Sequence, residues 1–306
     1  ATPTEKAVPP VVKFFDDWVE KNPNDAIAVA AINALTDCIK TSDATTIMHL
    51  QIHLKGAAEQ LLEAKSAAYK AIQLQAACDL FVLHVTRTAR LDLQDLEAVK
   101  LILIERGERF SEQSRQCRQT IAELGSHFFH DAEVILTHGQ SNVVTALFLR
   151  AAALGKRFRV IVTEAQPGRD GLKTVKLLRD AGLTAELIID SAVGFVMDKV
   201  DMVVVGAQGV VENGGIINKI GTNQMAIVAA ANKKPFYVAA ESYKFARLYP
   251  LNQSDLPEIE KYMYLTKEPS DVDDVMMREP ILDYTPPQYI TLLFTDLGVL
   301  TPSAVS

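Results

Sequence analysis

Cysteine and long apolar runs are scarce in this chain of 306 residues. Its three cysteines, Cys38, Cys78 and Cys117, form no C-x-x-C pair and no zinc-type cluster with histidine. An odd number of thiols is typical of a reducing compartment. No apolar run reaches the ~18 residues that a membrane span needs, and residues 1–10 lack the apolar core of a signal peptide. These absences predict a cytosolic protein without a membrane partner.

An excess of positive charge is also missing, because 31 lysines and arginines face 38 acidic residues and the net charge is −7. A general nucleic-acid binder needs a basic surface to neutralise phosphates, so direct nucleic-acid binding is not expected. The pairs His49/His53 and His127/His130 have metal-ligand spacing on predicted helices. Neither pair has the acid of an H-E-x-x-H motif, so an exposed helix face is favoured and no metal site is predicted.

Proline and glycine are nearly absent from the first part of the chain. No proline occurs between Pro23 and Pro167, and only Gly56 precedes Gly107. Helices exclude proline from their interior and disfavour glycine, so residues 1–125 are expected to form a helical domain. The expected helices cover 25–40, capped by Asn24 or Asp25, then 42–65, 70–89 and 93–129, the last being one helix or two divided at Gly107.

The second part, residues 126–306, changes to alternating strand and helix patterns. Such alternation predicts an α/β domain whose parallel sheet is covered on both faces. Residues 258–274 break the pattern and are expected to form a surface excursion, before 289–300 return to the core. The expected strands are 133–137, 159–163, 185–190, 202–205 and 235–239, and the expected helices are 142–154, 170–181, 193–199 and 223–231.

The segment GAQGVVENGGIINKIGT, from Gly206 to Thr222, holds five of the 15 glycines and is expected to be a turn between a strand and a helix. A glycine-dense turn lets backbone N–H groups approach an anion, and Asn218 and Lys219 add an amide and a cation. The segment matches neither the dinucleotide fingerprint nor the P-loop. A phosphate site and a tight turn with helix-capping glycines both remain open.

Ligands of parallel sheets bind beyond the carboxyl ends of the strands. Four predicted strand ends would converge on one crevice, and each polar side chain there could be an acid or base. Taken singly, each is better explained as a helix cap or a partner of the backbone. The polar residues of this crevice are His138, Glu164, Asp190, Gln208, Glu212 and Lys219.

Several long segments closely resemble the alpha-subunit family of eukaryotic translation initiation factor 2B. The resemblance covers nearly the whole chain and implies a helical N-terminal domain followed by a Rossmann-like C-terminal domain. The segments are VVGAQGVVENGGIINKIGTNQMA, KPFYVAAESYKF, RLYPLNQ and LLFTDLGVLTPSAVS, with VTEAQP, DSAVGFVMDKVD, IERGERF (residues 104–110) and AVAAI upstream.

The same family is related to isomerases of ribose-1,5-bisphosphate and methylthioribose-1-phosphate, which use a cysteine and an aspartate as acid and base. Gly139 and Gln208 stand at those two positions here, and neither titrates. The resemblance therefore implies a vestigial site that binds a sugar phosphate or nucleoside monophosphate without turnover. An active isomerase, with His138 acting instead, is the alternative. The implied ligand residues are His138, Gly139, Gln208, Asn218, Lys219, Glu164 and Arg106.

The resemblance also implies a regulatory function with no cofactor. The family's five-subunit complex exchanges GDP for GTP on initiation factor 2, and the alpha subunit senses the phosphorylated alpha subunit of that factor in the integrated stress response. The implied partners are the beta, gamma, delta and epsilon subunits. Thr46 matches a threonine of the regulatory region, although it could simply cap a helix. Apolar residues in 223–240 and 289–300 predict a homodimer through the C-terminal domain.

Overall fold

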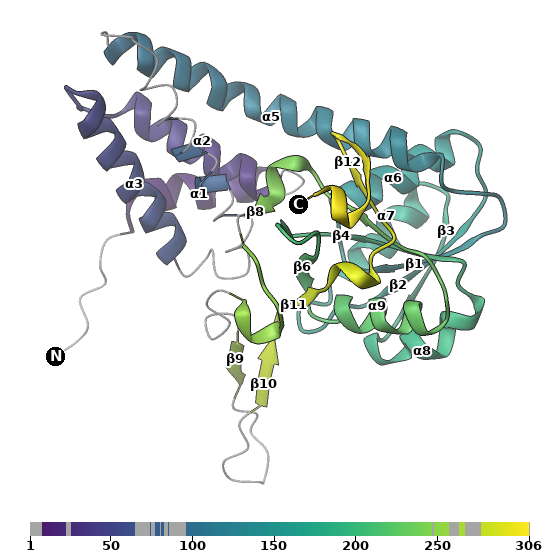
Figure 1. Cartoon of the computed structure of the whole chain (residues 1–306). Helices are drawn as coiled ribbons and strands as arrows, with labels where there is room; N and C mark the ends of the chain where they lie inside the picture. The colour runs from purple at the N-terminus through teal and green to yellow at the C-terminus, as the bar shows by residue number, and fades with distance from the viewer. Residues whose placement is uncertain are drawn as a thin grey trace. The chain divides into compact units, whose positions relative to one another are not determined.

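The computed structural model divides into two compact units, residues 1–115 and 116–306 (Figure 1). The division falls within helix α5 (Leu96–Ser126), whereas the sequence places a boundary at 125, near the end of that helix. The residues that the structure describes are 8–22, 26–64, 74, 77–79, 81–82, 85, 96–246, 248–256, 263–266 and 277–305.

The first unit is helical, as the shortage of proline and glycine predicts. Its helices are α1 (Pro10–Lys21), α2 (Ile27–Lys40), α3 (Ile47–Glu63) and the greater part of α5. Helix α3 begins five residues later than predicted, because the Thr46 hydroxyl caps it by accepting from His49 N at 3.1 Å. The predicted caps Asn24 and Asp25 lie outside the described residues, as does most of the predicted helix 70–89.

Helix α5 runs without interruption past Gly107, so of the two predicted alternatives the single helix is present and the division at Gly107 is not. A Cβ atom at Gly107 would lie 1.9 Å from Thr36 Oγ1 of α2. Thr36 is buried, and its hydroxyl donates to the Ile32 carbonyl at 2.6 Å. The glycine therefore provides room for close packing of two helices rather than a break in one of them.

The second unit contains a seven-stranded sheet in the order β13-β12-β7-β4-β1-β2-β3. All neighbours are parallel except β12 and β13, so the predicted α/β class with a parallel sheet is confirmed. The strands are β1 (Val134–His138), β2 (Arg159–Thr163), β3 (Thr184–Ile188), β4 (Met202–Gly206), β7 (Phe236–Ala239), β12 (Leu292–Thr295) and β13 (Gly298–Leu300).

Helices cover both faces of this sheet (Figure 1). Side chains of α6 (Asn142–Ala153) and α7 (Gly171–Asp180) form one buried apolar cluster, and those of α8 (Val193–Val196) and α9 (Thr222–Ala231) form the other. Successive strand residues alternate between the two clusters, as strand geometry requires. Ile135 belongs to the first cluster and Leu136 to the second.

The predicted turn between β4 and α9 is instead an antiparallel hairpin, β5 (Gly209–Val211) and β6 (Ile216–Lys219). The hairpin joins β8 (Phe245–Ala246) and β11 (Leu282–Thr285) in a four-stranded sheet of order β11-β6-β5-β8. Asn218 and Lys219 consequently lie on a strand, where pairing holds their backbone.

Two further strands form a separate ribbon, in which β9 (Met263–Thr266) pairs with β10 (Met277–Pro280). The rest of the predicted excursion 258–274 lies outside the described residues. Within the described part of the chain, no helix is both long and apolar enough to span a bilayer.

Candidate functional site

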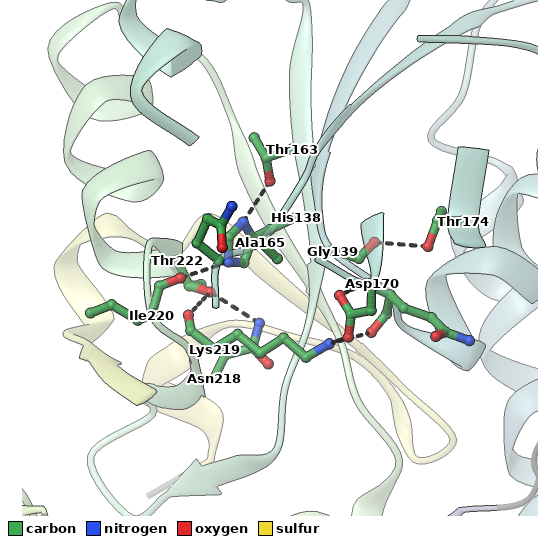
Figure 2. Close-up of polar contacts among 12 residues, drawn as sticks. His138, Gly139, Thr163, Ala165, Asp170, Thr174, Asn218, Lys219, Ile220 and Thr222 are labelled. Carbon is green, nitrogen blue, oxygen red and sulfur yellow. Dashed lines mark hydrogen bonds and ion pairs between the residues drawn. The ribbon is translucent and has the colours of Figure 1, made fainter. Parts of the chain in front are cut away.

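The carboxyl ends of β4, β1, β2 and β3 lie side by side, as predicted, because these strands are consecutive neighbours in the sheet. His138 is in register with Thr163, and Thr163 with Ile188. Figure 2 shows the polar contacts at this edge. The strand-end cluster comprises His138, Gly139, Glu164, Asp170, Asp190, Gln208, Asn218 and Lys219.

His138, the last residue of β1, is 3% exposed and is held by both ring nitrogens (Figure 2). Its Nε2 lies 2.8 Å from the Ile220 carbonyl oxygen, and its Nδ1 lies 2.6 Å from Thr163 Oγ1. A carbonyl can only accept, so Nε2 carries the proton and Nδ1 accepts from the Thr163 hydroxyl. Burial lowers the pKa of the ring, which keeps it neutral. The ring therefore has no spare nitrogen for acid–base chemistry.

Gly139 follows β1 with φ +59°, in the left-handed region. A Cβ atom there would lie 2.8 Å from both Ala165 Cβ and Asp170 Oδ1. The backbone of Gly139 is held on both sides, since its carbonyl accepts from Thr174 Oγ1 at 2.8 Å and its N–H donates to the Thr163 carbonyl at 3.3 Å. The space that a side chain at this position would need is filled by the neighbouring loop.

Asp170 and Lys219 form an ion pair inside the cluster (Figure 2). Asp170 precedes α7, but its backbone is helical (φ −80°, ψ −9°) and its side chain makes no capping bond to α7. The carboxylate instead contacts Lys219 Nζ and accepts from Gln140 N at 3.1 Å. The sequence pattern does not single out Asp170 as a site residue, because its place at a helix start indicates only a cap.

The side-chain amide of Asn218 has a hydrogen-bond partner, whereas the amide oxygen of Gln208 has none in the described structure. The Asn218 amide donates to Thr222 Oγ1 at 3.1 Å. Gln208 Oε1 is buried and has no hydrogen-bond partner in the described structure. A buried acceptor without a donor is costly, which makes this oxygen unusual among buried polar groups.

Asp190 and Glu164 organise the loop after β2. Asp190 accepts from Ala165 N at 2.9 Å and from Gln166 N at 2.7 Å. Glu164 lies 3.4 Å from Arg169 in an ion pair. Asp190 thus binds the backbone, as the sequence predicts for single carboxylates at strand ends, and Glu164 binds a neighbouring charge. Glu212, another predicted crevice residue, is exposed in the turn between β5 and β6.

Asp283, a residue of β11 that the sequence pattern does not single out, places its carboxyl group against the beginning of α9. It lies opposite Asn218 in the β11–β6 register, and its Oδ2 accepts from Gly221 N at 2.8 Å and Asn223 N at 2.9 Å. Burial raises its pKa to about 7, although these N–H groups oppose the shift. Two N–H groups at the end of the glycine-rich turn, those of Gly221 and Asn223, are therefore bound by the chain's own carboxyl group and not by an external anion.

The other predicted functional residues lie in the first unit. Arg106 is exposed on α5, and its role as a ligand residue stays a prediction. Thr46 is the exposed N-cap of α3, so its capping role is present and its regulatory role stays a prediction. His49 and His53 are exposed on α3, and the described residues contain no group of three side chains suited to a metal.

Comparison with known proteins places this chain in a family. Residues 20–302 match the initiation factor 2 subunit family. The chain is 47% identical to translation initiation factor eIF2B subunit alpha of Dictyostelium discoideum, over 97% of this chain and 94% of that protein.

Two further proteins are similar to this chain, one in sequence and one in fold. The ribose 1,5-bisphosphate isomerase of Archaeoglobus fulgidus is 35% identical over 68% of this chain and 67% of that protein. The tetrameric eIF2B-beta2-delta2 complex from C. thermophilum contains a chain with a TM-score of 0.76 and 20% identity, covering 96% of this chain and 90% of that one. The match over nearly all residues and the high identity to an alpha subunit lead to one assignment: this chain belongs to the initiation factor 2 subunit family.

Proposed function

We propose that this chain is a regulatory, non-catalytic alpha-type subunit of the complex that exchanges GDP for GTP on initiation factor 2 in the cytosol. The observation that carries the proposal is the 47% identity to a eIF2B alpha subunit over 97% of the chain. Identity of this extent covers both units, so it supports a shared function as well as a shared fold.

The geometry at the strand ends supports the absence of turnover. Proton transfer on a sugar needs a group that titrates within reach of the substrate. Gly139 and Gln208 offer none, and both nitrogens of His138 are already hydrogen-bonded. The alternative, a working isomerase, rests on the relatedness to the Archaeoglobus fulgidus enzyme. Conversion of ribose 1,5-bisphosphate by the purified chain above a no-protein background would favour that alternative.

The cluster retains groups suited to a phosphorylated sugar or nucleoside monophosphate. Lys219 supplies a cation, while Gln208 Oε1 is an unpaired acceptor for a hydroxyl group. The proposed ligand is thus bound and not transformed, and it stabilises the fold that presents the regulatory surface.

The proposed partners are the other subunits of the complex, a second copy of this chain, and the phosphorylated alpha subunit of initiation factor 2. Most apolar residues of 223–240 and 289–300 are buried in the chain's own core, so they give little reason to propose a homodimer.

Two exposed residues at the edge of the sheet support a homodimer instead. Val299 lies on the edge strand β13, and Leu297 directly precedes that strand. A light-scattering mass near two chains would support it, and a mass near one would refute it.

The test of the regulatory proposal is an exchange assay with the reconstituted complex. Thr46→Lys, or omission of this chain, should leave GDP release from unphosphorylated initiation factor 2 largely unchanged and should weaken inhibition by the phosphorylated form. Thr46→Ser is the matched control, because serine keeps the capping hydroxyl. Full inhibition with folded Thr46→Lys in a complex of normal composition would remove Thr46 from the sensing surface. Full inhibition without the chain would refute the proposal itself.

A further inference from the structure

Lys219, the one lysine or arginine among the residues named above as the strand-end cluster, already has an anion beside it (Figure 2). Asp170 places one carboxylate oxygen on Lys219 Nζ and the other on the backbone N–H of Gln140. An ammonium group and a backbone N–H are the contacts that a phosphate oxygen would make. The Asp170 carboxylate thus stands in the position of a ligand anion.

This arrangement depends on Gly139. The Asp170 Oδ1 atom lies only 2.8 Å from the place of a Cβ at residue 139, so a larger residue there would compete with the carboxylate for space. Glycine at this position therefore has two effects. It carries no titratable group, and its lack of a side chain leaves space for the Asp170 carboxylate beside Lys219.

The Lys219–Asp170 ion pair is also partly buried, so its attraction is only partly screened by water. The side chains of Lys219 and Asp170 are 28% and 22% exposed. Water screens such a pair less than it screens a fully exposed one. A phosphate that approaches Lys219 must separate this pair or share the ammonium group with the carboxylate, which repels it.

We infer that Asp170 is an affinity-setting residue: an internal anion that competes with the phosphate group of a small ligand for Lys219. This inference rests on the ligand site of the proposed function. Its consequence is a gain of binding when the carboxylate is neutralised, which is the opposite of what loss of a merely structural residue would cause.

The experiment is a calorimetric titration at constant ionic strength, with ribose 5-phosphate and inorganic phosphate as probes. Asp170→Asn is nearly isosteric and can still accept from Gln140 N. It should bind ribose 5-phosphate about ten-fold more tightly than the unaltered chain, or ~1.4 kcal/mol. The control is Asp180→Asn, the same charge change at the exposed far end of α7. It should change the affinity less than about two-fold, because exposed distant charges are screened.

The gain must also depend on Lys219. In a Lys219→Ala background, Asp170→Asn should give no tighter binding than Lys219→Ala alone. Should Asp170→Asn lower the melting temperature, Asp170→Ser gives a second, smaller neutral residue for the same titration.

Unchanged or weaker binding by both neutral variants, in a chain that binds ribose 5-phosphate, would overturn the inference and leave the proposed ligand site standing. Absence of binding in every variant would overturn both. The exchange assay with phosphorylated initiation factor 2 would still test the regulatory function separately.

Discussion

At the scale of single residues, the strand-end cluster is defined by groups that the chain itself already satisfies. His138 is bonded at both nitrogens, and Asp283 covers N–H groups at the beginning of α9. Buried polar groups require such partners, because an unpaired one costs about 1–3 kcal/mol. Within the described structure, Gln208 Oε1 is one buried oxygen near the strand ends that lacks a hydrogen-bond partner, as do Oδ1 of Asp283 and Oδ1 of Asn223.

Gly139→Cys is the residue-scale prediction. The substitution introduces the residue type that the family resemblance implies for this position in the isomerases, yet it should not produce turnover of ribose 1,5-bisphosphate. A Cβ at this position meets Ala165 and Asp170 at 2.8 Å, and the positive φ adds strain. We expect a loss of stability of about 1–3 kcal/mol in urea denaturation.

Gly139→Ala is its control, because it adds the Cβ without the thiol and should carry most of the destabilisation. A cysteine variant as stable as the unaltered chain would show that the loop does not fill this space. Turnover by that variant would show that the site has kept the rest of an isomerase.

At the scale of helices and strands, the sequence predicts elements best where local patterns decide them. Strand β2 has the predicted bounds, 159–163, since a short β-branched run is set between polar residues. The hairpin β5–β6 was predicted as a turn, because its short strands are stabilised by β8 and β11, which lie far along the chain. Asp283 and the Asp170–Lys219 pair escaped prediction for the same reason: their partners are close only in the fold.

Gly107→Ala is the prediction for an element. Helix propensity alone favours alanine over glycine inside a helix by about 1 kcal/mol. Here the added methyl group would lie 1.9 Å from Thr36 Oγ1, so the packing of α5 on α2 must shift. We expect a net loss of about 1–3 kcal/mol, measured by thermal and urea unfolding.

Gly56→Ala provides the comparison, since a Cβ at that position of α3 meets nothing within 4 Å. It should leave stability unchanged or raise it. Equal effects of the two substitutions would show that close packing at Gly107 is unimportant.

At the scale of the whole molecule, two buried groups give stability opposite dependences on pH. The pKa of His138 is below its ordinary 6.5, so stability falls as the pH drops below ~6.5 and the unfolded chain takes up a proton. The pKa of Asp283 is raised from 3.8 to about 7, so its contribution is complete below pH ~4 and is lost as the pH rises towards 7. Each group contributes at most ~1.4 kcal/mol per pH unit.

We predict that replacing either group will leave the pH dependence of stability that the other group causes. Asp283→Asn should make the free energy of unfolding fall more steeply with acid below pH 6.5. His138→Gln should make it fall as the pH rises from about 4 to 7. Urea denaturation at four pH values between 4.5 and 7.5 measures both slopes. Parallel profiles for the two variants would contradict this assignment of signs.

The order of strands in the sheet differs from their order in the chain, so one strand is synthesised well before one of its neighbours. β7 ends at Ala239 and pairs on one side with β4, but its other neighbour, β12, begins only at Leu292. A ribosome adding about 5–20 residues per second needs roughly 3–10 s to cover that interval. Throughout it the β7 edge of the nascent sheet lacks its parallel partner, and unpaired edges recruit other chains. The interior position of β7 in the finished sheet thus implies a period of seconds when a chaperone can compete with aggregation.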